Sequence, residues 1–273
     1  MADTFLAFDG GTGNDTLFGT QGDDIMQGNG GADTLVGNAG NDLIYSSNAQ
    51  DPNGLNDTIG DQLNGGTGND TLMGGNGNDL LLGGSGSNLI NGGGGVDTVQ
   101  YENNSKRGDF TIALKDGNIG VTSATGGIDT LVGVERLLFG DVGVAYDIEG
   151  LAGQVYRLYQ AALNRAPEAS GLGYYFNVAD KGTSIEAIAF GFTHSPEFAR
   201  LYGANVSDQV YIANLYRNAL HREAEPEGMQ YWTDKLHNGM TREQVLLGFS
   251  ESPENKAAVI GSIQHGIIYD PVA

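Results

Sequence analysis

The chain has 273 residues, no cysteine, and 34 acidic against 13 basic side chains, which gives a net charge of −21 at pH 7. A charge this negative argues against nucleic acid or an anionic membrane as a partner and suits cation binding. The absence of cysteine excludes disulfides. The apolar runs fall far short of the roughly 18 residues of a membrane span, so we expect no membrane-spanning helix. The length predicts two or three domains.

Residues 1–9 predict a strand that covers one open end of the segment that follows. The N-terminal residues have neither a basic region nor an apolar core, so we expect no cleavable signal peptide.

From residue 10 to residue 100 the sequence repeats with a period of nine. Four units span 10–45, and five span 56–100 after a ten-residue insertion at 46–55. Units such as GGTGNDTLM and GGNGNDLLL share a glycine-rich first half, Asp or Asn at position six and an aliphatic residue at position eight. A fixed period of this kind predicts a repeat architecture.

Each unit predicts a tight turn followed by a three-residue strand. Glycine at positions one, two and four permits the positive φ angles that such a turn needs. Strand alternation places position eight on one face, and a strand this short must stack on its neighbours. We expect a ladder of buried aliphatic residues: Leu17, Met26, Leu35, Ile44, Leu63, Leu72, Leu81, Ile90 and Val99.

The acidic residues of the repeats are expected to stack as well. Residues 1–100 contain thirteen Asp and no Glu, Lys, Arg or His, and carboxylates one strand apart, about 5 Å, repel each other. With two units in each coil, the stacked pairs would include Asp15 with Asp33, Asp24 with Asp42, and Asp61 with Asp79.

A hard cation between the turns would remove this repulsion. Oxygen ligands in a loose, carbonyl-rich loop favour calcium over magnesium. We therefore predict several Ca²⁺ ions, held by the position-six side chains Asp15, Asp24, Asp33, Asp42, Asp61, Asp70, Asp79, Asn88 and Asp97.

The pattern G-G-x-G-x-D-x-U-x resembles the calcium-binding nonapeptide repeats of the RTX (repeat-in-toxin) proteins. The resemblance covers residues 10–100 and implies a calcium-loaded parallel β-roll in a bacterial protein that leaves the cell by type I secretion. Asn88 departs from the pattern at position six, so a site that involves it should be weaker. Two units carry Thr20 and Asn29 in place of the second glycine.

The glycine repeat stops at Tyr101, and residues 101–149 predict a β cap. Alternating segments at 110–114 and 119–121 flank a turn at 115–118, which indicates a hairpin, and 128–139 follows as a further strand. We expect this cap to close the roll and to shield its last edge. The segment also resembles one that commonly follows RTX repeats.

A second repeat, with a period of 57 residues, begins after Gly150. Ser195-Pro196-Glu197, for example, recurs as residues 252–254. The apolar spacing predicts about three short helices in each half. Expected helix starts are the Ser-Pro caps at Ser195 and Ser252 and capping boxes at Thr183 and Thr241, and the expected shared aromatic core is Tyr159, Tyr175, Phe192, Tyr216, Trp232 and Phe249.

This tandem unit, over about 154–256, resembles a bacterial domain family of unknown function that often follows RTX repeats and is similar to phycobilisome linker domains. The resemblance implies no agreed activity. The fold predicted for the whole chain is β plus α and multidomain: a calcium-stacked parallel RTX β-roll over 1–100, a β cap over 101–149, and an all-α domain of two homologous halves over 150–273.

No motif predicts catalysis. His194 and Ser195 have the residue types of acyl transfer, but Glu251 replaces the histidine in the second half, so a helix cap is the favoured interpretation. Arg165 and Arg222 recur before acidic or proline-containing loops and are expected to anchor them. An anion or glycan contact is the alternative for these two arginines.

We therefore predict a non-catalytic, calcium-binding module that folds on calcium and is extracellular or on the bacterial cell surface. Its helical domain is expected to bind an unidentified protein or glycan. One alternative is the accessory C-terminal part of a secreted hydrolase or lyase, whose catalytic domain should precede the repeats. The other is a surface adhesin or S-layer-like protein.

Overall fold

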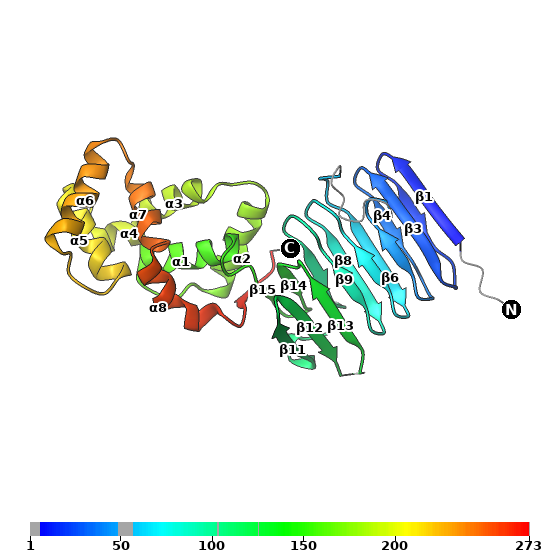
Figure 1. Cartoon of the computed structure of the whole chain (residues 1–273). Helices are drawn as coiled ribbons and strands as arrows, with labels where there is room; N and C mark the ends of the chain where they lie inside the picture. The colour runs from blue at the N-terminus through cyan, green and yellow to red at the C-terminus, as the bar shows by residue number, and fades with distance from the viewer. Residues whose placement is uncertain (1–5, 49–56, 103, 125, 273) are drawn as a thin grey trace. The chain divides into compact units, whose positions relative to one another are not determined.

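The computed structural model describes residues 6–48, 57–102, 104–124 and 126–272, and the chain divides into two compact units, 1–144 and 145–273 (Figure 1). Residues 1–5 and most of the insertion at 46–55 lie outside the described residues. Of the strand expected over 1–9, residues 6–9 belong to a strand, Leu6–Thr12, and residues 1–5 cannot be compared.

The first unit is a roll of two sheets through which the chain passes alternately. Its repeat strands are β1 (Leu6–Thr12), β2 (Thr16–Phe18), β3 (Asp24–Gly30), β4 (Thr34–Val36), β5 (Leu43–Tyr45), β6 (Gln62–Thr67), β7 (Thr71–Met73), β8 (Leu80–Ser85), β9 (Leu89–Asn91) and β10 (Thr98–Gln100). Strands one coil apart pair in parallel, in the orders β1-β3-β5-β7-β9 and β10-β8-β6-β4-β2. The parallel β-roll predicted from the nonapeptides is confirmed.

The core of the roll is the expected ladder of position-eight side chains. Leu35 lies beside Leu63, and Leu63 beside Leu81, in the register of one sheet. Eight of the nine predicted residues, from Met26 to Val99, are fully buried. Leu17 is only partly buried, because its coil is the first and has a neighbour on one side only.

The cap extends the roll by one more coil. It contains β11 (Phe110–Lys115), β12 (Asn118–Ser123), β13 (Ile128–Val132), β14 (Arg136–Leu138) and β15 (Gly143–Ala145). The expected hairpin is β11–β12, whose turn has positive φ at Asp116 and Gly117. Strand β13 then pairs in parallel with β9, and β14 with β10, so the edges of the last repeat strands are covered.

The second unit is helical. Its elements are α1 (Leu151–Leu163), α2 (Ala169–Asp180), α3 (Ile185–Thr193), α4 (Pro196–Tyr202), α5 (Asp208–Ala219), α6 (Pro226–His237), α7 (Arg242–Ser250), α8 (Pro253–Ile263) and a short strand, β16 (Ile267–Tyr269). Each half has four helices where three were expected. The reason is that the Ser-Pro steps at Ser195 and Ser252 start separate helices, with proline at the first helical position.

Most of the predicted helix caps are observed. The side chains of Ser195 and Ser252 accept hydrogen bonds from backbone amides three residues on, and Thr241 forms the expected capping box with Gln244. The box expected at Thr183 is wrong by one residue. Ser184 caps α3 instead, and the residue three positions on is Ala187, which has no side-chain acceptor to return the bond.

The aromatic residues repeat in space as they do in sequence. Phe192 contacts Tyr159 and Tyr175, with ring centroids 5.1 and 4.8 Å away. In the second half Phe249 contacts Tyr216 and Trp232 at 4.9 and 5.0 Å. The expected core burial is wrong for two of the six aromatic residues: Tyr175 and Trp232 are only partly buried, and the helix of Trp232, α6, buries none of its residues.

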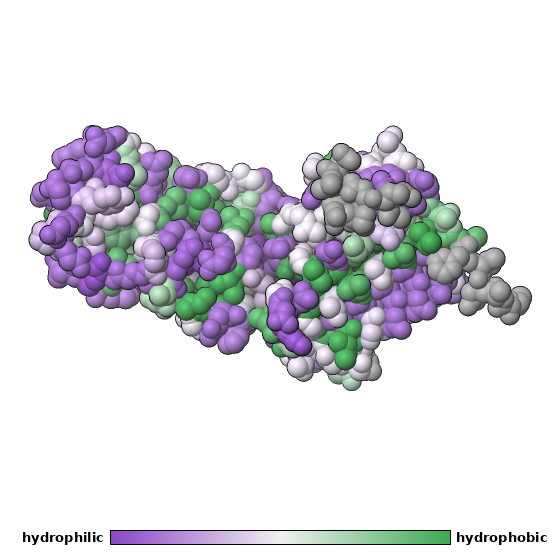
Figure 2. Space-filling model, viewed as in Figure 1, coloured by the Kyte–Doolittle hydropathy of each residue, from purple (hydrophilic) through white to green (hydrophobic). Residues whose placement is uncertain are grey.

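Helix α6 buries no residue, and the surface over α5 and α6 is largely hydrophilic (Figure 2). Within the described part of the chain, no helix is both long and apolar enough to cross a lipid bilayer.

Candidate functional site

The position-six side chains form two ladders along the roll. In each ladder the carboxylate Oδ1 accepts a hydrogen bond from the backbone amide of the position-six residue one coil earlier; Asp61 donates to Asp79 at 2.8 Å, and Asp79 to Asp97 at 2.9 Å. All nine predicted residues lie in the ladders. One contains Asp15, Asp33, Asp61, Asp79, Asp97 and Glu135, and the other Asp24, Asp42, Asp70, Asn88 and Asp129.

The second oxygen of most ladder carboxylates is buried and lacks a hydrogen-bond partner. Within the described residues this applies to the Oδ2 atoms of Asp33, Asp42, Asp57, Asp61, Asp70, Asp79 and Asp97. Buried polar atoms are nearly always paired, so a row of unpaired carboxylate oxygens indicates a ligand that accepts electron pairs.

In most units, glycine at position one keeps the space beside the carboxylate Oδ2 open. A methyl group on Gly74 would collide with Asp79 Oδ2 and lie 2.5 Å from the carbonyl oxygen of Gly92, which is one coil away. A methyl group on Gly37 would meet Asp42 Oδ2 and lie 2.7 Å from the Gly65 carbonyl oxygen. The glycines therefore preserve a space lined by one carboxylate and one carbonyl oxygen per coil.

These residues fit calcium. Among the described residues, no three acidic or histidine side chains are arranged to hold a metal ion by themselves, so we expect backbone carbonyl oxygens to contribute to any coordination sphere. Calcium accepts mixed carboxylate and carbonyl ligands in flexible geometry, whereas magnesium demands a near-ideal octahedron and retains its waters.

Burial also changes the protonation of the ladder. Desolvation raises the pKa of Asp79 to about 8, against a partial opposing effect of the hydrogen bond from the Asp61 backbone. The same cause raises the pKa of Asp61 and Asp97 to about 7 and that of Asp70 to about 6. Without a cation, the ionised form that binds calcium is therefore disfavoured near neutral pH.

The nine predicted positions are not equivalent. Asp24 Oδ2 accepts hydrogen bonds from the amide and the hydroxyl of Thr20, the residue that replaces the second glycine, so this carboxylate is already satisfied. Asn88 places its amide nitrogen beside Gly83, where other repeats have Oδ2, and donates to Asp129 Oδ1 at 2.9 Å. The weaker site expected at Asn88 remains a prediction, and we now also predict weaker calcium binding at Asp24.

The sequence analysis missed three acidic residues of the ladder region. Asp57 is buried, and its charge contributes to the raised pKa of Asp61 and Asp79. Asp129 and Glu135 end the two ladders, where they accept from the amides of Asn88 and Asp97. The sequence Ile128–Val132 has the order of a repeat strand, but Glu135 follows Asp129 after six positions and not nine, which breaks the nine-residue phase.

The two arginines of the helical repeat occupy matching ion pairs. Arg165 bonds to Glu197 at 2.7 Å and to Glu168 at 2.6 Å, and its interaction with Glu168 lowers the pKa of that carboxyl to about 2. Arg222 bonds to Glu254 at 2.7 Å and to Glu225 in the same way. Each guanidinium therefore ties an interhelical loop to the start of α4 or α8, as expected for a loop anchor.

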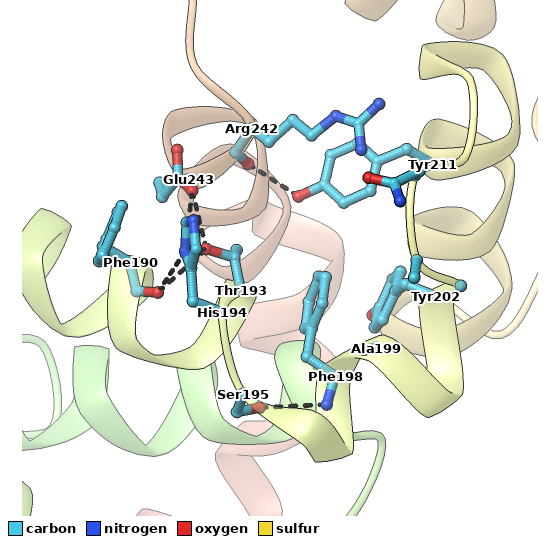
Figure 3. A pocket seen from close by; sticks show the side chains of 13 residues that line it. Phe190, Thr193, His194, Ser195, Phe198, Ala199, Tyr202, Tyr211, Arg242 and Glu243 are labelled. Carbon is cyan, nitrogen blue, oxygen red and sulfur yellow. Dashed lines mark hydrogen bonds and ion pairs between the residues drawn. The ribbon is translucent and has the colours of Figure 1, made fainter.

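The helical unit also contains a pocket of about 560 Å³, bounded by the end of α3, by α4, and by the starts of α5 and α7 (Figure 3). His194 and Ser195 lie on its wall. The Ser195 hydroxyl accepts from the Phe198 amide at 3.1 Å, and the His194 ring stacks on Phe190, with a centroid distance of 3.8 Å. The serine acts as a helix cap, in agreement with the favoured interpretation.

The chain thus combines a parallel β-roll of the calcium-binding repeat type with a tandem helical domain. A family model described as RTX calcium-binding nonapeptide repeat (4 copies) matches residues 9–44 and 61–99. A second model, Domain of unknown function (DUF4214), matches residues 152–201 and 189–259. The chain carries RTX repeats in its N-terminal part and a DUF4214 domain in its C-terminal helical part.

Two solved structures are similar to part of the chain. The extracellular lipase LipA from Serratia marcescens shares 18% identity over 48% of this chain and 17% of the lipase, with a TM-score of 0.22. The AlgE6R3 subunit of the Azotobacter vinelandii mannuronan C5-epimerase shares 28% identity over 45% of this chain and 72% of that subunit, with a TM-score of 0.23. Scores this low support no statement about function. No curated protein matches the chain significantly.

Proposed function

We propose that this chain is a secreted bacterial module whose roll folds around several calcium ions bound between stacked turns. The observation that carries the proposal is the row of buried, unpartnered carboxylate oxygens, most of which lie beside a glycine that keeps the adjoining space open. The principal ligands are Asp33, Asp42, Asp61, Asp70, Asp79 and Asp97. Asp15, Asp24 and Asn88 contribute less, since the first lies in the half-exposed end coil and the other two have alternative partners.

The energetic argument concerns the metal-free roll. An ionised carboxylate that is buried without a partner destabilises the folded state, and residues 1–100 contain no basic side chain that could pair with it. A bound cation removes this penalty. A site filled at ten to a hundred times its dissociation constant adds roughly 1.4–2.7 kcal/mol, so several sites together decide whether the roll folds.

Calcium-dependent folding also fits export. Extracellular calcium modules bind with dissociation constants of roughly 10⁻⁴–10⁻³ M, so such a roll stays unfolded at low cytosolic calcium and folds outside the cell. We place the protein outside the bacterial cell or on its surface, exported by type I secretion, with no catalytic role. The helical domain serves as an interaction domain for a protein or glycan partner.

Circular dichroism of the full chain tests the calcium proposal. Addition of millimolar calcium to chelated protein should increase the β signal and add a second thermal transition, while the helical signal stays constant. Magnesium at the same concentration is the control and should do much less. An unchanged spectrum and an unchanged melting curve after calcium addition would contradict the proposal.

A further inference from the structure

The helical pocket breaks the internal symmetry of its unit. Helices α5 and α3 are the sequence counterparts of α1 and α7 in the 57-residue repeat. Helix α1 packs closely along α7, but in the described helical unit α5 and α3 make no comparable contact. The pocket lies where that contact is missing, between the end of α3 and the start of α5.

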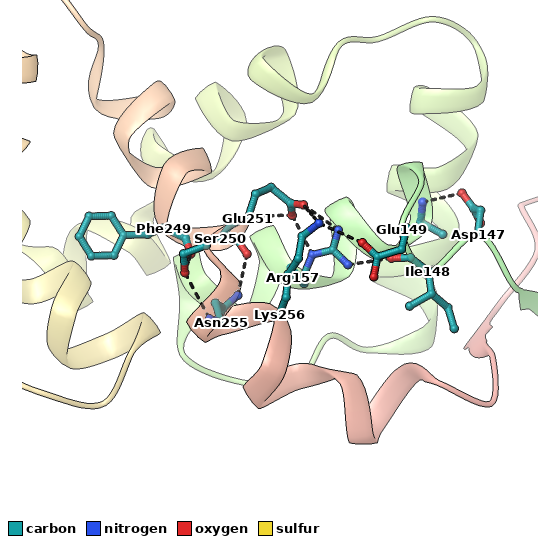
Figure 4. Close-up of polar contacts among 11 residues, drawn as sticks. Asp147, Ile148, Glu149, Arg157, Phe249, Ser250, Glu251, Asn255 and Lys256 are labelled. Carbon is teal, nitrogen blue, oxygen red and sulfur yellow. Dashed lines mark hydrogen bonds and ion pairs between the residues drawn. The ribbon is translucent and has the colours of Figure 1, made fainter.

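At the α1–α7 contact, which corresponds by sequence to the missing α3–α5 contact, an ion pair joins the two helices (Figure 4). The Arg157 side chain is only 1% exposed and donates to both oxygens of Glu251, at 2.8 and 2.7 Å. Its Nη1 atom donates to the carbonyl oxygen of Ile148 at 2.7 Å. These three bonds use one N–H of each guanidinium nitrogen and join α1 to the end of α7.

At the equivalent positions of α5 and α3, shorter or differently directed side chains replace this pair. The counterpart of Arg157 is Asn214, which donates to the Tyr202 carbonyl oxygen at 3.1 Å. The counterpart of Glu251 is His194, which is 57% exposed and stacks on Phe190. Because the same helical scaffold can close this space with an ion pair, the fold itself does not require the pocket.

The pocket wall combines one apolar surface with charged groups of both signs. Phe190 is 55% exposed, so it and His194 form a ring surface open to solvent. On the opposite wall, Arg242 Nη2 donates to the Val206 carbonyl and to Asp208. In the described structure its Nε and Nη1 groups have no partner, so they can donate to a ligand.

Glu243 supplies the acceptor. Its side chain is 17% exposed, and Oε1 accepts from the Thr193 hydroxyl at 2.7 Å. Burial acts to raise the pKa of Glu243, but the hydrogen bonds, that of Thr193 first among them, outweigh burial and lower the pKa. The carboxylate is therefore ionised at neutral pH.

We propose that this pocket binds a sugar residue of a neutral glycan. A sugar ring has an apolar C–H face that can pack on the Phe190–His194 surface, and its hydroxyls both donate and accept, so they can use Glu243 and Arg242 together. The volume lies in the roughly 300–1,000 Å³ range of small-molecule sites. With one charge of each sign on its wall, the pocket gives no net attraction to a purely anionic or purely cationic ligand.

The inference rests on the proposal that the helical domain is an interaction domain, and it does not depend on the calcium sites. The test is calorimetry of the calcium-loaded full chain with cellohexaose, xylohexaose and maltohexaose as neutral probes. Oligogalacturonate and a neutral hexapeptide are the competing classes. We expect at least one neutral oligosaccharide to bind, and the other two classes not to bind at this pocket.

Two sets of variants locate the binding. Phe190→Ala should weaken it by roughly tenfold or more, as expected for loss of a central aromatic contact. Leu247→Ala, at the repeat-equivalent position outside the pocket, is the matched control and should leave affinity unchanged. The double variant Asn214→Arg with His194→Glu recreates the Arg157–Glu251 pair at the equivalent positions. It should abolish binding, while the melting temperature stays the same or rises.

The outcomes distinguish this inference from the calcium proposal. No binding by any neutral probe, or equal binding by the wild type and Phe190→Ala, would overturn the sugar site while leaving calcium-dependent folding intact. Stronger binding of oligogalacturonate or peptide at this pocket would overturn the neutral-sugar class. Pocket-dependent sugar binding by a chain whose roll ignores calcium would support the sugar site and refute the other proposal.

Discussion

In the repeat segment, residues 1–100, carboxylates are buried in rows and the sequence contains no basic residue, whereas the deepest charge of the helical unit, Arg157, lies against Glu251. Residues 1–100 contain thirteen acidic side chains and no basic one, but residues 150–273 contain thirteen acidic and nine basic side chains. The helical unit therefore neutralises its buried charge internally. On the calcium proposal, the roll takes its counter-charge from the surroundings, so we expect its folding to respond to calcium and that of the helices not to.

The largest expected effect is the response to calcium removal. A chelator should unfold the roll and leave a fragment of residues 145–273 with an unchanged cooperative melt, because no carboxylate ladder lies in the helical unit. Calorimetry of the full chain and of the fragment, each with and without calcium, measures this. A fragment that is unfolded alone, or that melts higher with calcium, would show that the two units fold as one.

The second effect is that the stability of the roll should depend on pH in opposite directions without and with calcium. Because the folded-state pKa values of Asp79, Asp61 and Asp97 are raised to about 8, 7 and 7, their stabilising contribution is full below the unfolded value of 3.8 and is lost as the pH rises through 7–8. In chelator, the roll should therefore become more stable as the pH falls from 8 to 5.

With calcium present, the roll should instead become less stable as the pH falls, because protons compete with the metal for the same carboxylates. The helical unit should not change over this range, because the lowered pKa of Glu168, about 2, matters only in stronger acid. Urea unfolding monitored by circular dichroism at pH 8, 6.5 and 5 measures the stability of the chelated roll, the calcium-loaded roll and the helical unit. A chelated roll that loses stability on acidification would contradict the assigned burial of the ladder.

The third effect concerns the charges of the helical unit. Glu251→Ala leaves the buried Arg157 guanidinium without its carboxylate and should cost about 3 kcal/mol or more of unfolding free energy. Glu254→Ala, three residues on, removes a partner of the partly exposed Arg222 and should cost about 1 kcal/mol or less. Chemical denaturation of both variants in chelator, with Trp232 fluorescence as the probe, gives the two values. Equal losses would mean that burial does not set the strength of these pairs.

The smallest effect distinguishes individual ladder positions. Asp79→Ala should remove bound calcium and lower the free energy of unfolding in calcium by roughly 1.4–2.7 kcal/mol per lost site. Asn88→Ala should release less calcium, because its amide already bonds to Asp129 and to the amide of Asp70. Calorimetric stoichiometry compares the two variants, and identical losses would contradict the inequality of the sites.

The nonapeptide spacing was enough to predict the roll, its aliphatic core and the stacking of its aspartates, since each is a local consequence of a fixed period. What it could not show depended on contacts between distant residues. Asp129 joins a ladder 41 residues after Asn88 and out of phase with the repeat. The number of helices was underestimated because the Ser-Pro steps that start α4 and α8 were interpreted only as caps.

The helical pocket was beyond sequence analysis for the same reason. Arg157 and Glu251, which are 94 residues apart, are replaced at the equivalent positions by Asn214 and His194. The alignment of the two halves reveals both substitutions. Only the packing shows that His194 lines a pocket.

The direction of the two ladders bears on how such an array gains and loses repeats in evolution. Each ladder carboxylate serves the amide of the preceding coil, so loss of the first coil removes Asp15 and Asp24 without depriving any later amide of its acceptor. Loss of the cap would leave the backbone amides of Asn88 and Asp97 without their hydrogen-bond acceptors. Duplications and deletions are therefore tolerated at the N-terminal end of the array, while the terminating segment 126–139 is fixed in place.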